Sequence, residues 1–146
     1  MSASKLALAL QGVIGKNAER VGIKNWMTTG IPELDAALSG LFEKGGIPGG
    51  RLIEIFGPAS SGKTFLATMV MKAAQDMGGI AGFSDHERSF EPKLAESLGL
   101  CIDPDVGNFV YKKPETFEES ILLAMHFCEQ VRKLKLIPDS APLVWV

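Results

Sequence analysis

The chain has 146 residues, of which 46% are apolar and 22% charged, and its formal net charge is −2. This length suffices for one domain with a hydrophobic core but hardly for two. The charge balance gives no overall basic signature for nucleic acid, and no apolar run reaches the length of a membrane-spanning helix. Cys101 and Cys128 form no C-x-x-C motif, which fits reduced thiols in the cytoplasm.

The N-terminal part is predicted to form a helical arm ahead of the main domain. Its apolar residues recur at helical spacing: Leu6, Leu10, Val13 and Ile14. This pattern predicts an amphipathic helix to about Lys16, suited to packing or to docking on a partner. Residues 21–27 are expected to form a short strand or an extended linker. We therefore predict an arm and linker over residues 1–27 and a core domain over residues 28–146.

Turn-forming residues frame the next predicted elements. Pro32 and the acidic Glu33 mark the start of a helix, and Gly40 marks its end. Residues 44–50 read KGGIPGG, a composition that we expect to be irregular. Residues 52–56 are mostly apolar and predict a short buried strand.

The remainder of the chain alternates between predicted helices and strands. Helices are expected at residues 65–77, 92–98 and 116–135, and strands at residues 80–84, 109–111 and 143–146. On the last helix, one apolar stripe is expected to be buried: Ile121, Leu122, Met125, Cys128 and Val131. The alternation predicts an α/β fold with a mainly parallel sheet flanked by helices. Because the chain stops inside an apolar strand, we expect the sequence to be part of a longer protein.

A phosphate-binding motif follows the strand predicted at residues 52–56. Residues 57–64 read GPASSGKT and fit the pattern G-x-x-x-x-G-K-[ST]. Such a loop turns backbone N–H groups around phosphate oxygens, and the helix that follows adds its positive dipole. Lys63 is expected to reach the β- and γ-phosphates, and the Thr64 hydroxyl to bind Mg²⁺. The predicted nucleotide contacts in this stretch are Gly57, Pro58, Ala59, Ser60, Ser61, Gly62, Lys63, Thr64 and Phe65.

Carboxylates follow the strand predicted at residues 80–84. Ligands of open parallel sheets bind beyond the carboxyl ends of the strands, so we expect Asp85 and Glu87 near the phosphate motif. A carboxylate there could polarise the water that attacks a γ-phosphate, or hold a water bound to Mg²⁺. The alternative is that both are solvated loop charges. An aspartate that positions Mg²⁺ would be expected directly after Val146, at the tip of the last strand.

Three stretches together resemble the RecA/RadA recombinases: TTGIPELDAALSG at residues 28–40, GGIPGGRLIEIFGPASSGKT at residues 45–64 and GFSDHERSFEP at residues 82–92. The resemblance covers about residues 20–146 and implies a P-loop NTPase fold of RecA type. It implies a DNA-dependent ATPase that uses ATP and Mg²⁺, forms filaments on single-stranded DNA and promotes strand exchange in recombination and repair. It also implies that the arm, residues 2–19, docks on the neighbouring protomer.

The resemblance also assigns roles to single residues. It implies that Glu87 is the catalytic glutamate, that Lys63 contacts the γ-phosphate and that Thr64 is the Mg²⁺ ligand. Family members carry an aspartate and a tyrosine near the adenine, where this chain has Glu91 and Leu94. Glu91 could receive the adenine amino group, and Leu94 could pack on the base without aromatic stacking.

Two other functions fit the same residues. The chain could belong to another RecA-fold ATPase, such as a replicative helicase or a KaiC-like protein. It could also be a non-catalytic module that docks on filaments. DNA binding is implied by the family alone, because the family's DNA-binding loops would lie beyond Val146. By themselves, residues 1–146 are expected to bind nucleotide weakly and to hydrolyse it poorly. Residues 40–46 are slightly longer than in typical bacterial members, which hints at a divergent or phage-type relative.

Overall fold

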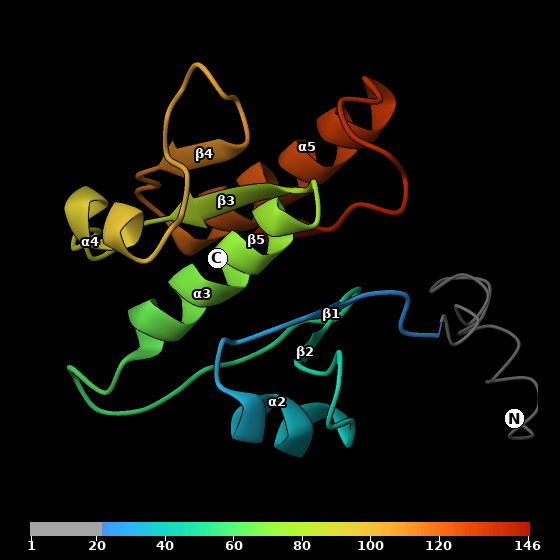
Figure 1. The fold of residues 1–146 in the computed structure, drawn as a ribbon. Helices are drawn as coiled ribbons and strands as arrows, with labels where there is room; N and C mark the ends of the chain where they lie inside the picture. Colours follow the sequence, from blue (N-terminus) through green and yellow to red (C-terminus); the bar gives the residue numbers. More distant parts are fainter. Residues whose placement is uncertain (1–21) are drawn as a thin grey trace, which may run out of the picture.

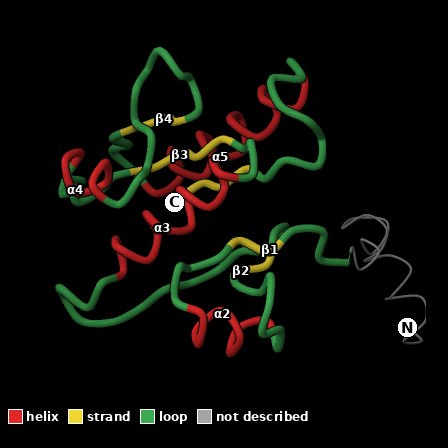
Figure 2. Tube along the Cα trace, in the orientation of Figure 1, coloured by secondary structure: helices red, strands yellow, loops and turns green. Residues whose placement is uncertain are grey.

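The computed structural model describes residues 22–146, in which helices and strands alternate (Figures 1 and 2). The elements are β1 (Trp26–Met27), α2 (Pro32–Ser39), β2 (Ile47–Pro48), α3 (Lys63–Asp76), β3 (Ile80–Ser84), α4 (Pro92–Ser97), β4 (Phe109–Lys112), α5 (Phe117–Lys133) and β5 (Leu143–Trp145). The helix predicted to about Lys16 lies outside the described residues, so the arm stays a prediction. None of the helices within residues 22–146 combines the length and the apolar character needed to cross a bilayer.

The centre of the fold is a parallel sheet of three strands in the order β4–β3–β5. Ala81 of β3 lies opposite Phe109 of β4 and Val144 of β5. The chain passes from β3 to β4 through α4, and from β4 back across β3 to β5 through α5. Each connection carries a helix that returns the chain to the same edge, as parallel pairing requires. The predicted α/β fold with a parallel sheet is confirmed.

Side chains of the sheet alternate between two helical layers. On one face, Phe83 packs in a cluster with Met71 of α3 and Ala95 of α4. On the other face, Ile80 packs in a cluster with Phe127 of α5. This alternation follows from the two-residue period of a strand. The sheet is therefore covered by α3 and α4 on one face and by α5 on the other (Figure 1).

The stripe predicted to be buried on α5 is largely exposed. Val131 is buried, but four of its predicted companions are exposed: Ile121, Leu122, Met125 and Cys128. The buried residues of α5 are Phe127 and Val131, which lie one turn apart and pack with Ile80. A sheet of three strands covers only a narrow stripe of α5. Helical spacing alone therefore predicted more buried residues on this helix than the sheet can cover.

A second, two-stranded antiparallel sheet packs against the other side of α3. Met27 of β1 pairs with Ile47 of β2, and both pack with Val70 of α3. Gly46 has a φ of +126°, and a side chain there would collide with the backbone of Met27. The expectation of irregular structure over residues 44–50 was therefore wrong at Ile47–Pro48, where two residues form β2.

The strand predicted at residues 52–56 is absent, and this prediction was wrong. The segment joins β2 to α3 without pairing with either sheet (Figure 1). Leu52 is 100% exposed and Phe56 is 87% exposed. The apolar pattern describes side chains, whereas a strand also needs a neighbouring backbone to bind its N–H and C=O groups. β3 already has a neighbour on each side, and the segment lies on neither outer edge.

Candidate functional site

The start of α3 and the end of β3 lie at the same end of the molecule. A turn at residues 77–79 joins the helix to the strand, so α3 runs antiparallel to β3 (Figure 1). Lys63 begins the helix, and Asp85 follows the strand. The fold therefore places the G-x-x-x-x-G-K-T stretch and the carboxylate loop at the same end of the molecule, although the strand expected ahead of the stretch is absent.

Residues 57–64 form an exposed turn that ends in α3. Ser60 and Gly62 have φ values of 62° and 88°, in the left-handed region. Leu66 N–H donates to the Gly62 carbonyl at 2.9 Å, which is the first hydrogen bond of the helix. At Gly57, an added Cβ would lie 2.8 Å from the Ser61 hydroxyl oxygen. The glycines thus permit a tight turn, most of whose residues are exposed.

The Lys63 side chain folds back over this turn. Its Nζ donates to the carbonyl oxygens of Gly57 at 3.0 Å and Pro58 at 2.8 Å. The ammonium group is thereby held at the mouth of the turn by two neutral acceptors. An anion in the turn would offer a stronger, charge-assisted partner than these carbonyls.

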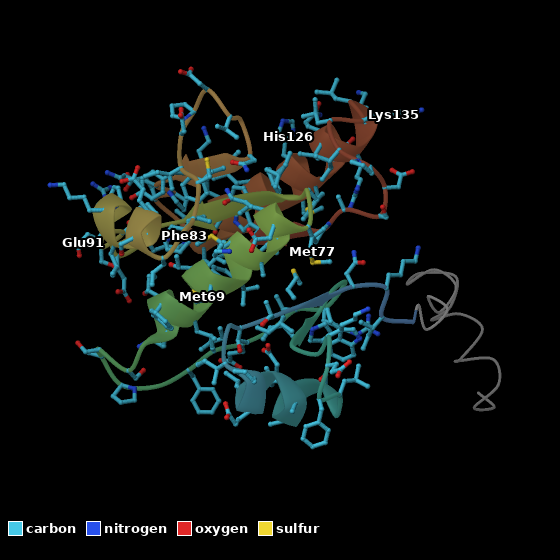
Figure 3. The ribbon with its side chains drawn as sticks, viewed as in Figure 1. Met69, Met77, Phe83, Glu91, His126 and Lys135 are labelled. Carbon is cyan, nitrogen blue, oxygen red and sulfur yellow. The ribbon has the colours of Figure 1, made fainter. Side chains whose placement is uncertain are left out.

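A small cavity lies between α3 and α4. Its volume is about 130 Å³, and it is lined by Thr64, Phe65, Thr68, Ser89, Phe90, Glu91, Leu94 and Ala95. Three residues predicted to bind nucleotide are thus brought together: Thr64, Phe65 and Glu91. Figure 3 shows Glu91 at the α4 side of this end of the molecule. The cavity combines apolar walls with one carboxylate, but it has room for only part of a drug-sized ligand.

Asp85 is held by its own chain. The residue is 4% exposed, and its carboxylate accepts hydrogen bonds from the Tyr111 hydroxyl at 2.7 Å, from Phe90 N–H at 2.9 Å and from Ser89 N–H at 3.2 Å. Burial by itself would raise the pKa of Asp85, but these donors outweigh burial and lower the pKa below its usual value. Both carboxylate oxygens are therefore engaged internally, and this carboxylate does not face a ligand.

Glu87 lies in the same loop but is exposed. Within residues 22–146 its side chain makes no hydrogen bond or ion pair. Its neighbour Arg88 adopts a φ of 56° and pairs through Nη2 with Glu115 Oε1 at 2.9 Å. Of the two carboxylates considered from the sequence, only Glu87 is thus available to a reactant.

The residues described here fit a magnesium site only in part. Residues 22–146 contain no group of three or more histidine, cysteine, aspartate or glutamate side chains that could hold a metal ion. Thr64, predicted as the Mg²⁺ ligand, supplies one hydroxyl beside the cavity. A magnesium ion here would need its remaining ligands from phosphates and water, which is its usual preference.

Sequence reasoning missed Tyr111 and Glu115. Both are polar partners of the loop that carries Glu87, and both come from the region of β4 and the start of α5. A signal was present for Tyr111. It lies two residues after Phe109 in the same strand, so both side chains face the side of the sheet that α3 and α4 cover.

Comparison with known proteins identifies a family. A family model described as the RecA N-terminal domain matches residues 11–135. The relatives found include the protein RecA of Symbiobacterium thermophilum, which is 40% identical over 108 residues, or 74% of this chain and 28% of that protein. The protein RecA of Clostridium novyi is 44% identical over 103 residues, or 70% of this chain and 26% of that protein.

A longer match is found in Rhizobium leguminosarum bv. viciae. Its protein RecA is 38% identical over 127 residues, which cover 87% of this chain and 34% of that protein. The chain therefore spans about a third or less of the length of the curated relatives it matches.

Proposed function

The chain belongs to the RecA family, and from this premise we propose that it is the nucleotide-binding part of an ATP-dependent DNA recombinase. In this proposal the chain has the P-loop NTPase fold of RecA type. The complete protein hydrolyses ATP in response to DNA, forms filaments on single-stranded DNA and promotes strand exchange. The observation that carries the proposal is the exposed turn at residues 57–64, at the same edge as the loop that bears Glu87.

The phosphate end of ATP would bind at this turn. The backbone N–H groups of residues 59–64, at the start of α3, would surround the phosphate oxygens. Lys63 would exchange its two carbonyl partners for the β- and γ-phosphates. Thr64 would hold Mg²⁺, which offsets the charge that develops on the phosphates during transfer.

The adenine end would bind between α3 and α4. Phe65 and Leu94 would pack on the base, and Glu91 would receive the amino group of the adenine. Glu87, exposed at the neighbouring loop, would orient and deprotonate the water that attacks the γ-phosphate. The residues proposed for these roles all come from the start of α3, the loop after β3 and α4, which lie at the same end of the molecule.

The partners follow from the family. We propose single-stranded DNA and further copies of the same protein as partners, with self-association through residues 2–19, and a cytoplasmic location. Residues 2–19 lie outside the part of the chain that the structure describes. The support for these partners and for this location therefore comes from the matched family.

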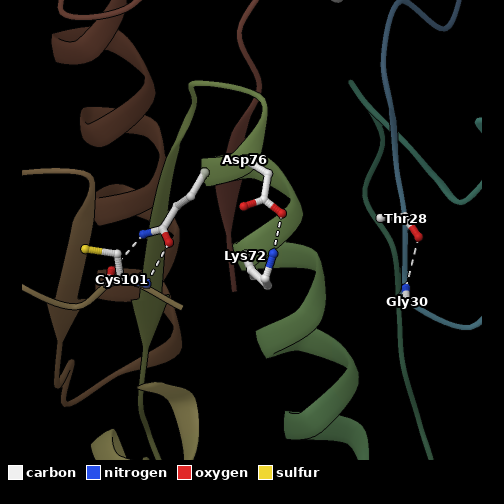
Figure 4. A network of polar contacts seen from close by, with 6 residues as sticks. Thr28, Gly30, Lys72, Asp76 and Cys101 are labelled. Carbon is white, nitrogen blue, oxygen red and sulfur yellow. Dashed lines mark hydrogen bonds and ion pairs between the residues drawn. The ribbon is translucent and has the colours of Figure 1, made fainter. Parts of the chain in front are cut away.

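The first test is binding of Mg²⁺–ATP to the purified chain. We expect Lys63→Ala to weaken binding roughly tenfold or more, because a hydrogen bond between charged groups contributes about 1.5–3 kcal/mol. A matched control is Lys72→Ala, since Lys72 lies on the same helix and pairs with Asp76, away from the turn (Figure 4). Absence of binding, or equal losses in the two variants, would contradict the proposal and favour a non-catalytic interaction module.

The second test is ATP turnover by the complete protein, measured with and without single-stranded DNA. We expect Glu87→Gln to abolish turnover while leaving ATP affinity nearly unchanged, because the amide keeps the shape of the side chain but cannot accept a proton. Turnover that persists in this variant would remove Glu87 from the proposed mechanism.

A further inference from the structure

We propose that Tyr111 is a positioning residue: acting through Asp85, it fixes the loop that carries Glu87. The catalytic consequence rests on the function proposed above, whereas the anchoring of the loop stands on its own contacts. This loop comprises residues 85–90, which follow β3 and lead towards α4.

The first contacts close the loop on itself. Asp85 stands at the start of the loop, and two of its donors, Ser89 N–H and Phe90 N–H, stand at the end. Glu87 lies between Asp85 and Ser89 in the sequence and takes no part in these hydrogen bonds. The carboxylate of Asp85 therefore sets the shape of the segment on which Glu87 is mounted.

Tyr111 ties this closed loop to the neighbouring strand. Its hydroxyl donates to Asp85 Oδ2 at 2.7 Å, the same oxygen that accepts from Phe90 N–H. Tyr111 belongs to β4 and lies directly opposite Phe83 in the parallel register. The hydroxyl thus links the orientation of the carboxylate to a fixed point of the sheet.

The ring of Tyr111 is held independently of its hydroxyl. It stacks on Phe83 at a centroid distance of 6.3 Å and lies 5.3 Å from the ring of Phe90. Phenylalanine at this position would keep both ring contacts and lose only the hydrogen bond to Asp85. The effect of the hydroxyl can therefore be measured by itself.

A second contact, an exposed ion pair that water screens, lies beside Glu87 and adds little to the anchoring. Arg88, the residue after Glu87, pairs with Glu115 at 2.9 Å. Glu115 N–H in turn donates to Glu119 Oε2 at 2.7 Å in the first turn of α5. Glu87 is therefore an exposed side chain on a segment held chiefly by the buried Asp85 contacts.

The anchoring also reaches the cavity between α3 and α4. Ser89 and Phe90 are part of its lining, and their N–H groups are the ones that Asp85 binds. A displacement of the Asp85 carboxylate would move the cavity wall and the Glu87 segment together. Tyr111 thereby fixes the position of Glu87, the proposed catalytic glutamate, relative to the proposed adenine site.

The deciding experiment is amide hydrogen exchange, resolved by residue, on the purified chain. We expect Tyr111→Phe to speed exchange at Ser89 and Phe90 by about tenfold, the factor that one hydrogen bond to a charged group supplies. Asp85→Asn should do the same or more. The amides of β3 should keep their rates in both variants, which separates a loosened loop from a destabilised fold.

Ser97→Ala is the matched control. It removes a side-chain hydrogen bond of the same length, 2.7 Å, to the Leu94 carbonyl of α4, and it does not contact the loop. It should leave exchange at Ser89 and Phe90 unchanged. Equal exchange in the wild type and Tyr111→Phe, or equal acceleration in Ser97→Ala, would overturn the proposal.

ATP turnover by the complete protein provides the readout that a merely structural role would leave unchanged. A positioning role for Tyr111 predicts that Tyr111→Phe lowers kcat about tenfold and changes KM for ATP less than about twofold. Faster loop exchange with unchanged kcat would overturn the positioning role. If Lys63→Ala and Glu87→Gln leave binding and turnover intact, the proposed function fails instead, and the exchange rates still decide whether Tyr111 anchors the loop.

Discussion

Gln75 and Cys101 form a reciprocal pair of hydrogen bonds. Gln75 Nε2 donates to the Cys101 carbonyl at 2.7 Å, and Cys101 N–H donates to Gln75 Oε1 at 2.9 Å (Figure 4). The same Nε2 donates to the side chain of Asn108 at 3.1 Å. One side-chain amide on α3 therefore satisfies the backbone of the connection that runs from α4 to β4.

Replacing Gln75 should destabilise the fold. We expect Gln75→Ala to lower the free energy of unfolding by about 1–3 kcal/mol, because the Cys101 backbone groups lose their partner in a partly buried position. Urea denaturation measures the effect. Gln130→Ala on α5 is the control, since the Gln130 side chain makes no hydrogen bond within residues 22–146. Similar midpoints for both variants would contradict this prediction.

Asp35 should make stability depend on acid pH. Its buried carboxylate accepts from Thr29 N–H at 2.7 Å, from the Thr29 hydroxyl at 2.6 Å and from the Thr28 hydroxyl. Burial raises the pKa of Asp35, but these hydrogen bonds outweigh it and lower the pKa below its usual value. The carboxylate therefore stabilises the folded state above the unfolded pKa of about 4, and this contribution is lost as pH falls through the folded pKa.

Asp35→Asn should accordingly lose about 1–3 kcal/mol of stability at pH 7, and the difference from the wild type should shrink below about pH 4. Urea midpoints at several pH values give the comparison. The control is Glu33→Gln, an exposed acid in the same helical turn. A difference that stays constant with pH would show that Asp35 acts through its shape rather than its charge.

Tyr111 should make stability depend on alkaline pH. Burial, with the hydrogen bond to Asp85 and its negative charge, raises the pKa of Tyr111 from its usual value of 10 to about 12. Its contribution is therefore complete below pH 10 and is lost as pH rises towards 12. Tyr111 is the sole tyrosine of the chain, so tyrosinate absorbance reports on it alone. In Asp85→Asn we expect the pKa to move back towards 10; an unchanged titration would contradict the Asp85 contact.

Gly82 should not tolerate a side chain. A Cβ at this position of β3 would collide with the ring of Trp145 on β5. We expect Gly82→Ala to lower the free energy of unfolding by about 1–3 kcal/mol through overpacking. Thermal unfolding followed by circular dichroism measures the change. Gly22→Ala is the control, because nothing lies within 4 Å of a Cβ there. Equal unfolding temperatures would show that the Trp145 ring moves aside freely.

Elements whose signals lie within a few residues were predictable from the sequence. The start of α5 is an example: the sequence predicted a helix from residue 116, and the Thr116 side chain caps it by accepting from Glu119 N–H at 3.1 Å. Gly40 ends α2, also as predicted, and the structure shows it in a left-handed conformation. By contrast, residues 52–56 carried the side-chain pattern of a strand, but pairing depends on where another backbone lies, and the local pattern contains no such information.

The same distinction applies to the candidate site. The G-x-x-x-x-G-K-T spacing predicted the turn before α3, because its glycines act locally. The spacing placed Asp85 and Glu87 at one edge without distinguishing them, and only the family resemblance singled out Glu87. Their separation into one buried and one exposed carboxylate depends on Tyr111, which reaches Asp85 only through the register of β4 on β3.

The unpaired connection between β2 and α3 has a consequence for limited proteolysis. A protease that cleaves after large apolar residues would find Leu52 and Phe56 in an accessible, extended backbone. Cleavage after Phe56 would cut the chain ahead of α3, yet Met27 and Ile47 would still pack against Val70. The two pieces should therefore elute together as a nicked complex and separate only in denaturant.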